Sequence, residues 1–335
     1  MLRSFAVVGL LALLASPGQA EPFRLIVTDL EPPLVPNSVM DLALDLGYFE
    51  RENVDVELVR VQQTPLAVTA LQAGEGEMAN IGVDSALQLV GRGQLDIMAV
   101  TSPSKSLSFM IVARDGIDSP GDLDGKRFGI GRVGSVDASL SAAVLDANGV
   151  DFDGLEQVAL GQPAARAQAL LAGQIDATTM SLGTWTTLPD KTGLHVLIDQ
   201  DAYFDAAPVV NKVNVVTADV LENRRDDVVA VVTALTKLSR DIAADPAIWV
   251  DAMSKARPDI ERSNLEALAQ SYARSWSVNG GLSAKSLETT ATWNFQSEDL
   301  ADIEPFPLSR WVDFTVADDV LAKIGTEADL DPADR

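Results

Sequence analysis

The chain has 335 residues, of which 25 are basic and 49 acidic, and its formal net charge is −24. This charge disfavours nucleic acid and anionic lipid as partners, and we expect no nucleic-acid partner. Cysteine is absent and His195 is the single histidine, which excludes disulfides, thiol nucleophiles, hydrolytic triads and clusters of histidine metal ligands.

The first twenty residues predict a cleavable export signal. Met1-Leu2-Arg3 is a short basic region, and the apolar run Phe5–Ala15 is too short to span a bilayer. Gly18 and Ala20 are the small residues that precede a cleavage site, so the mature chain should begin near Glu21. An N-terminal membrane anchor is the alternative. Without a cysteine at the new N-terminus the protein is not a lipoprotein, and we expect it free in the periplasm.

Strands and helices alternate in the segment that follows the leader. We expect strands at Phe23–Thr28, Asp55–Val61, Met78–Val83 and Asp96–Thr101, and helices at Val39–Glu50, Pro65–Ala73 and Ser85–Val90. Three prolines in Asp29–Ser38 exclude regular structure there, and Asn37-Ser38 can cap the following helix. The alternation with short links predicts a parallel sheet covered by helices.

A second α/β unit follows, and the chain then becomes helical. Strands are expected at Ser108–Arg114, Arg127–Ile130, Glu156–Leu160, Ala177–Ser181 and Leu194–Ile198, with helices at Val136–Asn148 and Gln162–Ala172. The run Val209–Ala218 reads as one more strand. Helices are then expected at Asp226–Ala244, Pro246–Ala256, Ser263–Ser275 and Trp311–Gly325.

A glycine loop between the strand Arg127–Ile130 and the next helix is the main candidate for ligand binding. Ser135 can cap the helix from Val136, and the free N–H groups of the first turn then form an anion or dipole site. The glycines at 129, 131 and 134 also spell the dinucleotide fingerprint GxGxxG. That fingerprint needs an acid at the end of the next strand, where Gly161-Gln162-Pro163 stands instead, so a nucleotide cofactor is the weaker interpretation.

Two pieces of the sequence resemble each other. Ala70–Gly74 with Glu77, and Ala169–Gly173 with Asp176, each predict a helix, a glycine stop, an acid and a strand, 99 residues apart. Any α/β protein can repeat such units. We favour two similar lobes with equivalent strand ends at Val83-Asp84-Ser85 and Met180-Ser181, because ligands gather at the carboxyl ends of strands.

Several motifs, in order along the chain, resemble one family. The motifs are Gly47-Tyr48-Phe49-Glu50 with Val54–Leu58, Ala70–Gly74 with Glu77, Ile117–Lys126, the glycine loop, Ala169–Ala177 and Trp311-Val312-Asp313. They are similar to motifs of ABC-transporter solute-binding proteins for sulfonates, nitrate and thiamine precursors. The resemblance covers essentially the whole mature chain.

The resemblance implies a two-lobed α/β fold of the periplasmic-binding-protein type II class, with two crossover segments near Ser104–Leu107 and Asp205–Asn211. The first lobe would comprise residues 21–105 and 205–335, and the second residues 106–204. The partners would be a small-molecule solute and the permease and ATPase subunits at the inner membrane. No cofactor, metal or catalytic residue is expected.

The resemblance places the solute at the loops after the strands. The residues that it implies are, from the first lobe, Asp29, Leu30, Asn37, Asp84, Ser85, Thr101 and Ser102; from the second lobe, Arg132, Gly134, Ser135, Val136, Thr179, Met180 and Trp185; and, near the return crossover, Asn211 and Asn214.

Several of these residues have a structural interpretation beside the functional one. Ser135 can cap its helix and still face a ligand. Arg132 can pair with a ligand anion, pair with Asp137 or lie in solvent. Trp185 can stack on a ligand ring or belong to the core. Asp84 can accept from a ligand amine, although capping the helix from Ser85 is the preferred interpretation.

These observations favour a binding protein without chemistry over an enzyme of the same fold. A small sulfonate or carboxylate is preferred as the solute, because Arg132, the helix from Val136 and the serines suit an anion. A pyrimidine vitamin precursor is the alternative, and a nucleotide-using enzyme is a weaker one. The related pyrimidine-forming enzymes use a histidine and a cysteine-rich motif, which this chain lacks in the matching regions.

Overall fold

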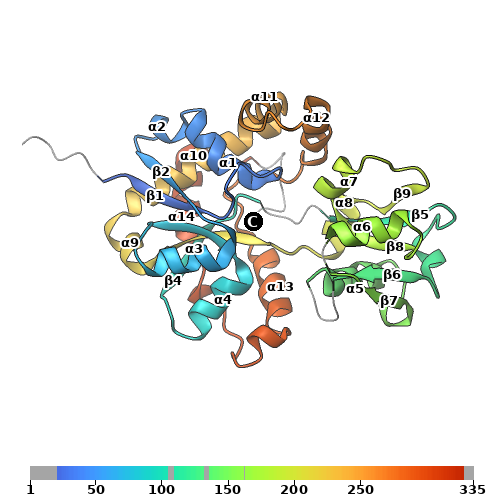
Figure 1. Cartoon of the computed structure of the whole chain (residues 1–335). Coiled ribbons are helices and arrows are strands. Elements are labelled where there is room, and N and C mark those ends of the chain that lie inside the picture. Colours follow the sequence, from blue (N-terminus) through green and yellow to red (C-terminus); the bar gives the residue numbers. More distant parts are fainter. Residues whose placement is uncertain (1–20, 105–108, 132–135, 162, 328–335) are drawn as a thin grey trace, which may run out of the picture.

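The computed structural model describes residues 21–104, 109–131, 136–161 and 163–327. The strands within these ranges form two five-stranded sheets, which Figure 1 shows as separate bodies. The first sheet has the order β2-β1-β3-β10-β4 and consists of β1 (Phe23–Val27), β2 (Val56–Arg60), β3 (Met78–Gly82), β4 (Ile97–Thr101) and β10 (Lys212–Thr217). The second has the order β7-β6-β8-β5-β9 and consists of β5 (Phe109–Arg114), β6 (Arg127–Ile130), β7 (Glu156–Ala159), β8 (Ala177–Ser181) and β9 (Leu194–Ile198).

Helices cover both sheets. The helices that accompany the first sheet are α1 (Val39–Asp45), α2 (Tyr48–Arg51), α3 (Gln63–Gln72), α4 (Val83–Gly91), α9 (Ala218–Asn223), α10 (Arg225–Ala244), α11 (Ala247–Ala256), α12 (Arg262–Ser271), α13 (Ala284–Asn294) and α14 (Phe314–Ile324). The second packs with α5 (Val136–Ala147), α6 (Pro163–Leu171), α7 (Leu182–Thr187) and α8 (Gln200–Ala206). Short 3₁₀ turns lie at Pro36–Ser38, Pro120–Leu123, Phe152–Gly154, Glu298–Leu300 and Leu308–Arg310.

The two sheets have the same topology. In the first sheet, β1 pairs in parallel with β2 and β3, and β10, which follows the second crossover, pairs antiparallel with β3. In the second sheet, β6 pairs in parallel with β7 and β8, and β5, which follows the first crossover, pairs antiparallel with β8. The predicted two-lobed α/β architecture with two crossovers is therefore confirmed. We propose that the lobes divide at 105/106 and 204/205; the first crossover falls partly on residues 105–108, outside the described ranges.

The carboxyl ends of the parallel strands face the crossovers in both lobes. In the first lobe, Thr101 ends β4 beside the start of β10, and Lys212 pairs with Gly82 at the end of β3. In the second lobe, Phe109 starts β5 opposite Ser181 at the end of β8. Because the chain leaves one sheet and enters the other at these edges, the two carboxyl edges lie toward the junction of the lobes.

The internal repeat predicted from the sequence has a structural counterpart at the opposite, amino-terminal edges. Glu77 accepts hydrogen bonds from the backbone N–H (2.6 Å) and guanidinium (2.6 Å) of Arg24, and Asp176 accepts the same pair of bonds from Arg127 (3.0 and 2.9 Å). Each carboxylate therefore ties the strand that it precedes to the neighbouring parallel strand. Helices α4 and α7, which follow these strands, begin at Val83 and Leu182.

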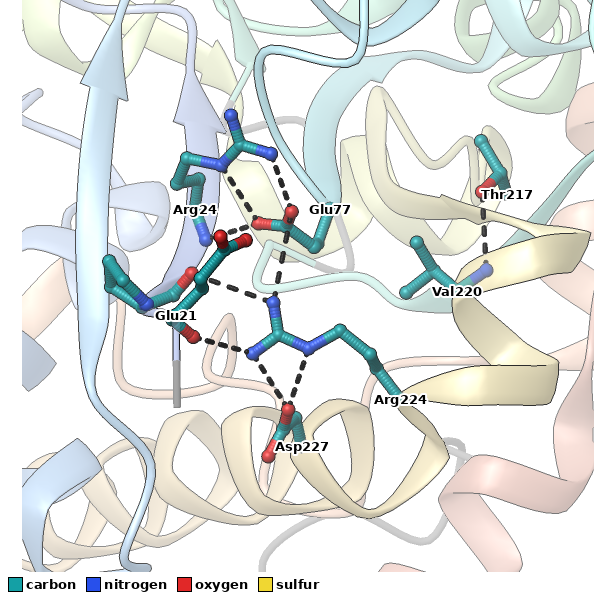
Figure 2. A network of polar contacts seen from close by, with 8 residues as sticks. Glu21, Arg24, Glu77, Thr217, Val220, Arg224 and Asp227 are labelled. Atoms are coloured by element: carbon teal, nitrogen blue, oxygen red, sulfur yellow. Dashed lines mark hydrogen bonds and ion pairs between the residues drawn. The ribbon is translucent and has the colours of Figure 1, made fainter. Parts of the chain in front are cut away.

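The first of these two networks is larger than the second. Figure 2 shows Glu77 between the guanidinium groups of Arg24 and Arg224, which lie 2.6 and 3.7 Å from it. Arg224 also pairs with Asp227 at 2.8 Å and donates to the backbone carbonyl of Glu21 at 3.0 Å. The network therefore fixes the first described residue against α10.

Three features of the helices differ from the sequence predictions. The helix predicted at Val39–Glu50 is broken at Gly47, whose positive φ of 71° ends α1 and starts α2. Helix α14 begins at Phe314 rather than Trp311, and α12 ends at Ser271 rather than Ser275. The prediction also missed α7, α8, α9 and α13.

Candidate functional site

A half-buried cation, Lys212, lies at the carboxyl edge of the first sheet. Its ammonium donates to the hydroxyl of Thr28 at 2.6 Å, and burial lowers the pKa of Lys212, with nearby Asp29 acting in the opposite direction. No carboxylate of the described residues forms an ion pair with this ammonium. A half-buried ammonium without an ion pair is partly removed from water, so this position favours a bound anion.

A chain of three asparagines lies beside Lys212. Asn80 donates to Asn214 at 2.7 Å and accepts from Asn37 at 3.4 Å, and all three side chains are buried. The Oδ1 atom of Asn37 has no hydrogen-bond partner among the described residues. Asn37 and Asn214, which were selected from the sequence, therefore meet through Asn80, which was not.

The remaining predicted residues of the first lobe differ in exposure. Leu30 is 59% exposed, and Asp84 and Asn211 are exposed as well. The backbone carbonyl of Asn211 accepts from Val83 at 3.0 Å. Thr101 and Ser102 are buried, where Thr101 donates to the carbonyl of Gly280 at 2.8 Å and the Ser102 hydroxyl donates to the carbonyl of Lys212 at 2.8 Å. Ser102 thereby fixes the backbone of the cationic residue.

The predicted capping role of Asp84 is wrong. Helix α4 begins at Val83 with Gly82 as its N-cap, and no side chain caps it. Asp84 and the partly buried Ser85 therefore lie inside the first turn, where the carboxylate still interacts favourably with the helix dipole. The sequence did not reveal this shift, because Val83 fits a strand end and a helix start equally well.

A polar cluster lies between Gly131 and the first turn of α5 in the second lobe. Arg166 of α6 is 5% exposed, and its guanidinium lies 3.3 Å from the carboxylate of Asp137. Asp137 also accepts from the backbone N–H of Gly131 at 2.8 Å. The hydroxyls of Thr179 and Ser141 are 2.6 Å apart beside it. The Nε–H group of Arg166 has no hydrogen-bond acceptor within the described residues, so it remains available to donate to a ligand.

Tyr203 completes this cluster from α8. Burial raises the pKa of Tyr203 to about 12, with Thr179 and Ser141 acting in the opposite direction, so the hydroxyl stays protonated at neutral pH. The loop residues Arg132, Gly134 and Ser135 lie outside the described residues, and α5 begins at the predicted Val136. Of the three partners considered for Arg132, Asp137 is now seen to be engaged by Arg166 and Gly131.

Two further predicted residues of the second lobe lie away from this cluster. Met180 is 1% exposed and packs in the core. Trp185 lines a cavity beside α12, where the ammonium of Lys191 lies 5.1 Å from its ring centroid. Their roles in solute binding stay predictions.

The sequence interpretation missed two cations, the half-buried Lys212 and the buried Arg166. A signal for Lys212 was present, because alternation along β10 places Lys212 and Asn214 on one face and Val213 on the other. No comparable signal marked Arg166, which stands in an ordinary amphipathic helix.

No group of three acidic or histidine side chains suited to a metal ion occurs in the part of the chain that the structure describes. Within the same ranges, no helix is both long and apolar enough to cross a membrane.

Comparison with known proteins gives the family. The profile of the family described as NMT1/THI5 like matches residues 39–248, and the chain belongs to this family. A Brucella abortus protein named as a binding protein is 26% identical over 261 residues, which cover 73% of this chain and 79% of that protein.

Solved structures share the fold at low identity. A periplasmic sulfonate-binding protein, SsuA, of Methylobacillus flagellatus is similar with a TM-score of 0.72 and 14% identity, covering 91% of this chain and 94% of that one. The type II periplasmic-binding-protein fold expected from the sequence is therefore confirmed. The desulfurization enzyme DSZB has the same fold, with a TM-score of 0.65 and 16% identity over 90% of this chain and 99% of that one. The fold alone thus accommodates both binding proteins and an enzyme.

Proposed function

We propose that this protein is the periplasmic solute-binding component of an ABC importer and closes its two lobes on a small organic anion. The family, the relatives named as binding proteins and the two-lobed fold support the transport role. The export signal predicted for residues 1–20 supports the periplasmic location. The permease and ATPase of the inner membrane are then its partners.

The observation that carries the anion is Lys212. Its side chain is half-buried at the edge where the lobes meet, and the only hydrogen bond of its ammonium among the described residues goes to the hydroxyl of Thr28. A sulfonate or carboxylate beside it would supply the missing negative charge in a site of low dielectric constant. Arg166 and the N–H groups at the start of α5 would then close on the anion from the second lobe.

The proposal treats the protein as a carrier without chemistry. DSZB shows that the fold can support an enzyme, but this chain has no cysteine to serve as a nucleophile, and its one histidine hydrogen-bonds the carbonyl of Ile117 at 3.0 Å. A sulfonate-type anion is preferred over an aminopyrimidine because the Lys212 ammonium attracts an anion and repels a ligand amine that carries a proton.

A thermal-shift screen tests the proposed function. The mature protein is first unfolded and refolded to remove carried-over ligand, and is then scanned with taurine, alkanesulfonates, small carboxylates and aminopyrimidines. A true solute at about 100 times its dissociation constant stabilises by about 2.7 kcal/mol, which gives a clear shift. A response to aminopyrimidines alone would overturn the anion, and a response to none of the four classes would overturn the proposed substrate range.

A further inference from the structure

One continuous segment of the first lobe contacts both crossovers. It consists of residues 276–283 and the helix α13 that follows them, and we call residues 276–294 the brace. Figure 1 shows α13 beside the return crossover, between the two sheets. The part before α13 holds the first crossover, and α13 itself holds the second.

The part of the brace before α13 is fixed to the end of β4, where the first crossover begins. The hydroxyl of Thr101 donates to the carbonyl of Gly280 at 2.8 Å, and the backbone N–H of Ser102 donates to the same carbonyl at 3.4 Å. Gly281 has a φ of 68°, and a Cβ atom there would lie 2.0 Å from the carbonyl oxygen of Ser102. Only glycine permits so close an approach, so the backbone of the brace packs directly on this crossover.

The burial of two adjacent residues locates the hinge in the return crossover. Val209 is buried in the cluster between the second sheet, α5 and α8, whereas Val210 is buried in a cluster of the first lobe that includes Ala291 of α13. The backbone N–H of Val210 also donates to the hydroxyl of Thr290 at 2.9 Å. The buried cores of the two lobes therefore part between residues 209 and 210, and α13 holds the chain on the first-lobe side of that point.

Trp293 extends from α13 to the other side of this hinge. Its half-buried side chain packs against the second-lobe cluster that contains Ala207 and Val209. The end of α13 that carries it is fixed in the first lobe, where the ring centroids of Phe295 and Phe306 lie 5.2 Å apart. Because packed interfaces are not continuously deformable, a rotation of the lobes about the hinge must break or rebuild this contact.

We propose that the brace sets the equilibrium between arrangements of the two lobes, and that Trp293 is the side chain through which it acts. The contact stabilises the arrangement that this structure has by the apolar surface that it buries, and an arrangement without the contact lacks that free energy. A solute that binds one arrangement best then binds with an affinity that depends on Trp293. This consequence rests on the proposed function, whereas the equilibrium of the lobes does not.

The distance between the lobes tests the proposal in the mature protein without any solute. Cysteine is absent from the chain, so Gln72→Cys in the first lobe and Ala147→Cys in the second, both at exposed positions, carry two spin labels. Pulsed electron paramagnetic resonance measures the distribution of distances between them. We expect Trp293→Ala to change the ratio of the lobe arrangements about tenfold (~1.4 kcal/mol), which shifts the mean distance or adds a second population.

The neighbouring Thr292 provides the matched control, because it is exposed on the same turn of α13. Thr292→Ala should leave the distance distribution unchanged. Trp293→Phe keeps an aromatic ring and should give a smaller shift than Trp293→Ala in the same direction. An unchanged distribution in folded Trp293→Ala, or an equal change in Thr292→Ala, overturns the proposal. If Trp293→Ala does not fold, Trp293→Phe takes its place, and an unchanged distribution there overturns the proposal as well.

Compounds that respond in the thermal-shift screen give a second readout. Their dissociation constants should change in Trp293→Ala and stay within about twofold in Thr292→Ala. A screen without any response overturns the proposed substrate range and leaves the distance measurement intact. A response in the screen together with an unchanged distance distribution in Trp293→Ala overturns the role of the brace alone.

Discussion

At the scale of single residues, Lys212 is the group on which solute binding should depend most. A charged hydrogen bond in a buried site contributes about 1.5–3 kcal/mol, which corresponds to about 10- to 150-fold in affinity. We therefore expect Lys212→Met to weaken binding of an anionic solute by that factor in calorimetric titration. The unliganded variant should unfold at the same temperature or higher, because the substitution removes a half-buried charge that has no ion-pair partner among the described residues.

The pH dependence of binding follows from the pKa of Lys212. Burial places this pKa below the ordinary value of 10.5, and only the protonated ammonium attracts an anion. Affinity should therefore be constant at neutral pH and fall as the pH rises through the lowered pKa. Lys212→Arg keeps its charge throughout this range and should abolish the fall. A decline of equal size in both proteins would assign the titration to another group.

The stability of the unliganded protein should show the opposite trend over the same range. The folded state has the lower pKa at Lys212, so it holds fewer protons than the unfolded state between the two pKa values. The free energy of unfolding contributed by this residue therefore rises as the pH increases toward 10.5. Urea titrations of the unsubstituted protein and Lys212→Met at several pH values measure the difference.

Single residues also show what the sequence could and could not predict of the candidate site. The polar residues Asn37 and Asn214 were selected because the family resemblance places the solute at the loops after the strands and near the return crossover. Lys212 and Arg166 were missed because a cation is usually exposed, and only the packing of the elements shows that Lys212 is half-buried and Arg166 is buried. Burial is a property of the assembled fold, which local pattern does not reveal.

At the scale of the elements, the Glu77 network should stabilise the first sheet more than its counterpart does the second. Glu77 contacts two arginines, Arg24 and Arg224, whereas Asp176 has one arginine partner, Arg127, within the described ranges. We expect Glu77→Gln to lower the free energy of unfolding by about 2 kcal/mol, in line with hydrogen bonds to charged groups. The matched variant Asp176→Asn should cost less. Urea unfolding monitored by circular dichroism compares them.

The same network predicts an acid transition. Burial alone would raise the pKa of Glu77, but the bonds from Arg24 more than offset it, and the resulting pKa lies below the ordinary value of 4.5. The stabilisation is therefore full above pH 4.5 and is lost as the pH falls through the lowered value. Glu77→Gln should flatten this part of the stability curve. A curve of unchanged slope would show that other carboxylates govern the acid transition.

Elements with a strong local pattern were predicted well, and elements decided by tertiary contacts were not. Strands β6, β8 and β9 have the predicted bounds, because short apolar runs between turn residues define them. Helix α13 was missed because its sequence AKSLETTATWN is rich in threonine, a weak helix former. Its Thr290 is buried and accepts from the backbone N–H of Val210, so packing on the crossover stabilises the helix.

At the scale of the whole molecule, the net charge of −24 opposes the approach of the proposed solute. An anion is repelled at long range by the protein and attracted at short range by Lys212 and Arg166. Salt screens the first interaction far more than the second, because the screening length falls from about 30 Å at 0.01 M to about 8 Å at 0.15 M, while the buried cations are little screened.

Association of the solute should therefore accelerate with ionic strength, in contrast to most electrostatically assisted binding. Between 0.01 and 0.15 M salt we expect the association rate constant of an anionic solute to rise about three- to tenfold, measured by stopped-flow fluorescence. The dissociation rate should change little, because it depends on contacts that are buried when the lobes close. A zwitterionic solute should show a flat profile, and a cationic ring a decrease. A fall in the association rate with salt would show that the local cations dominate at long range as well, or that the solute is not an anion.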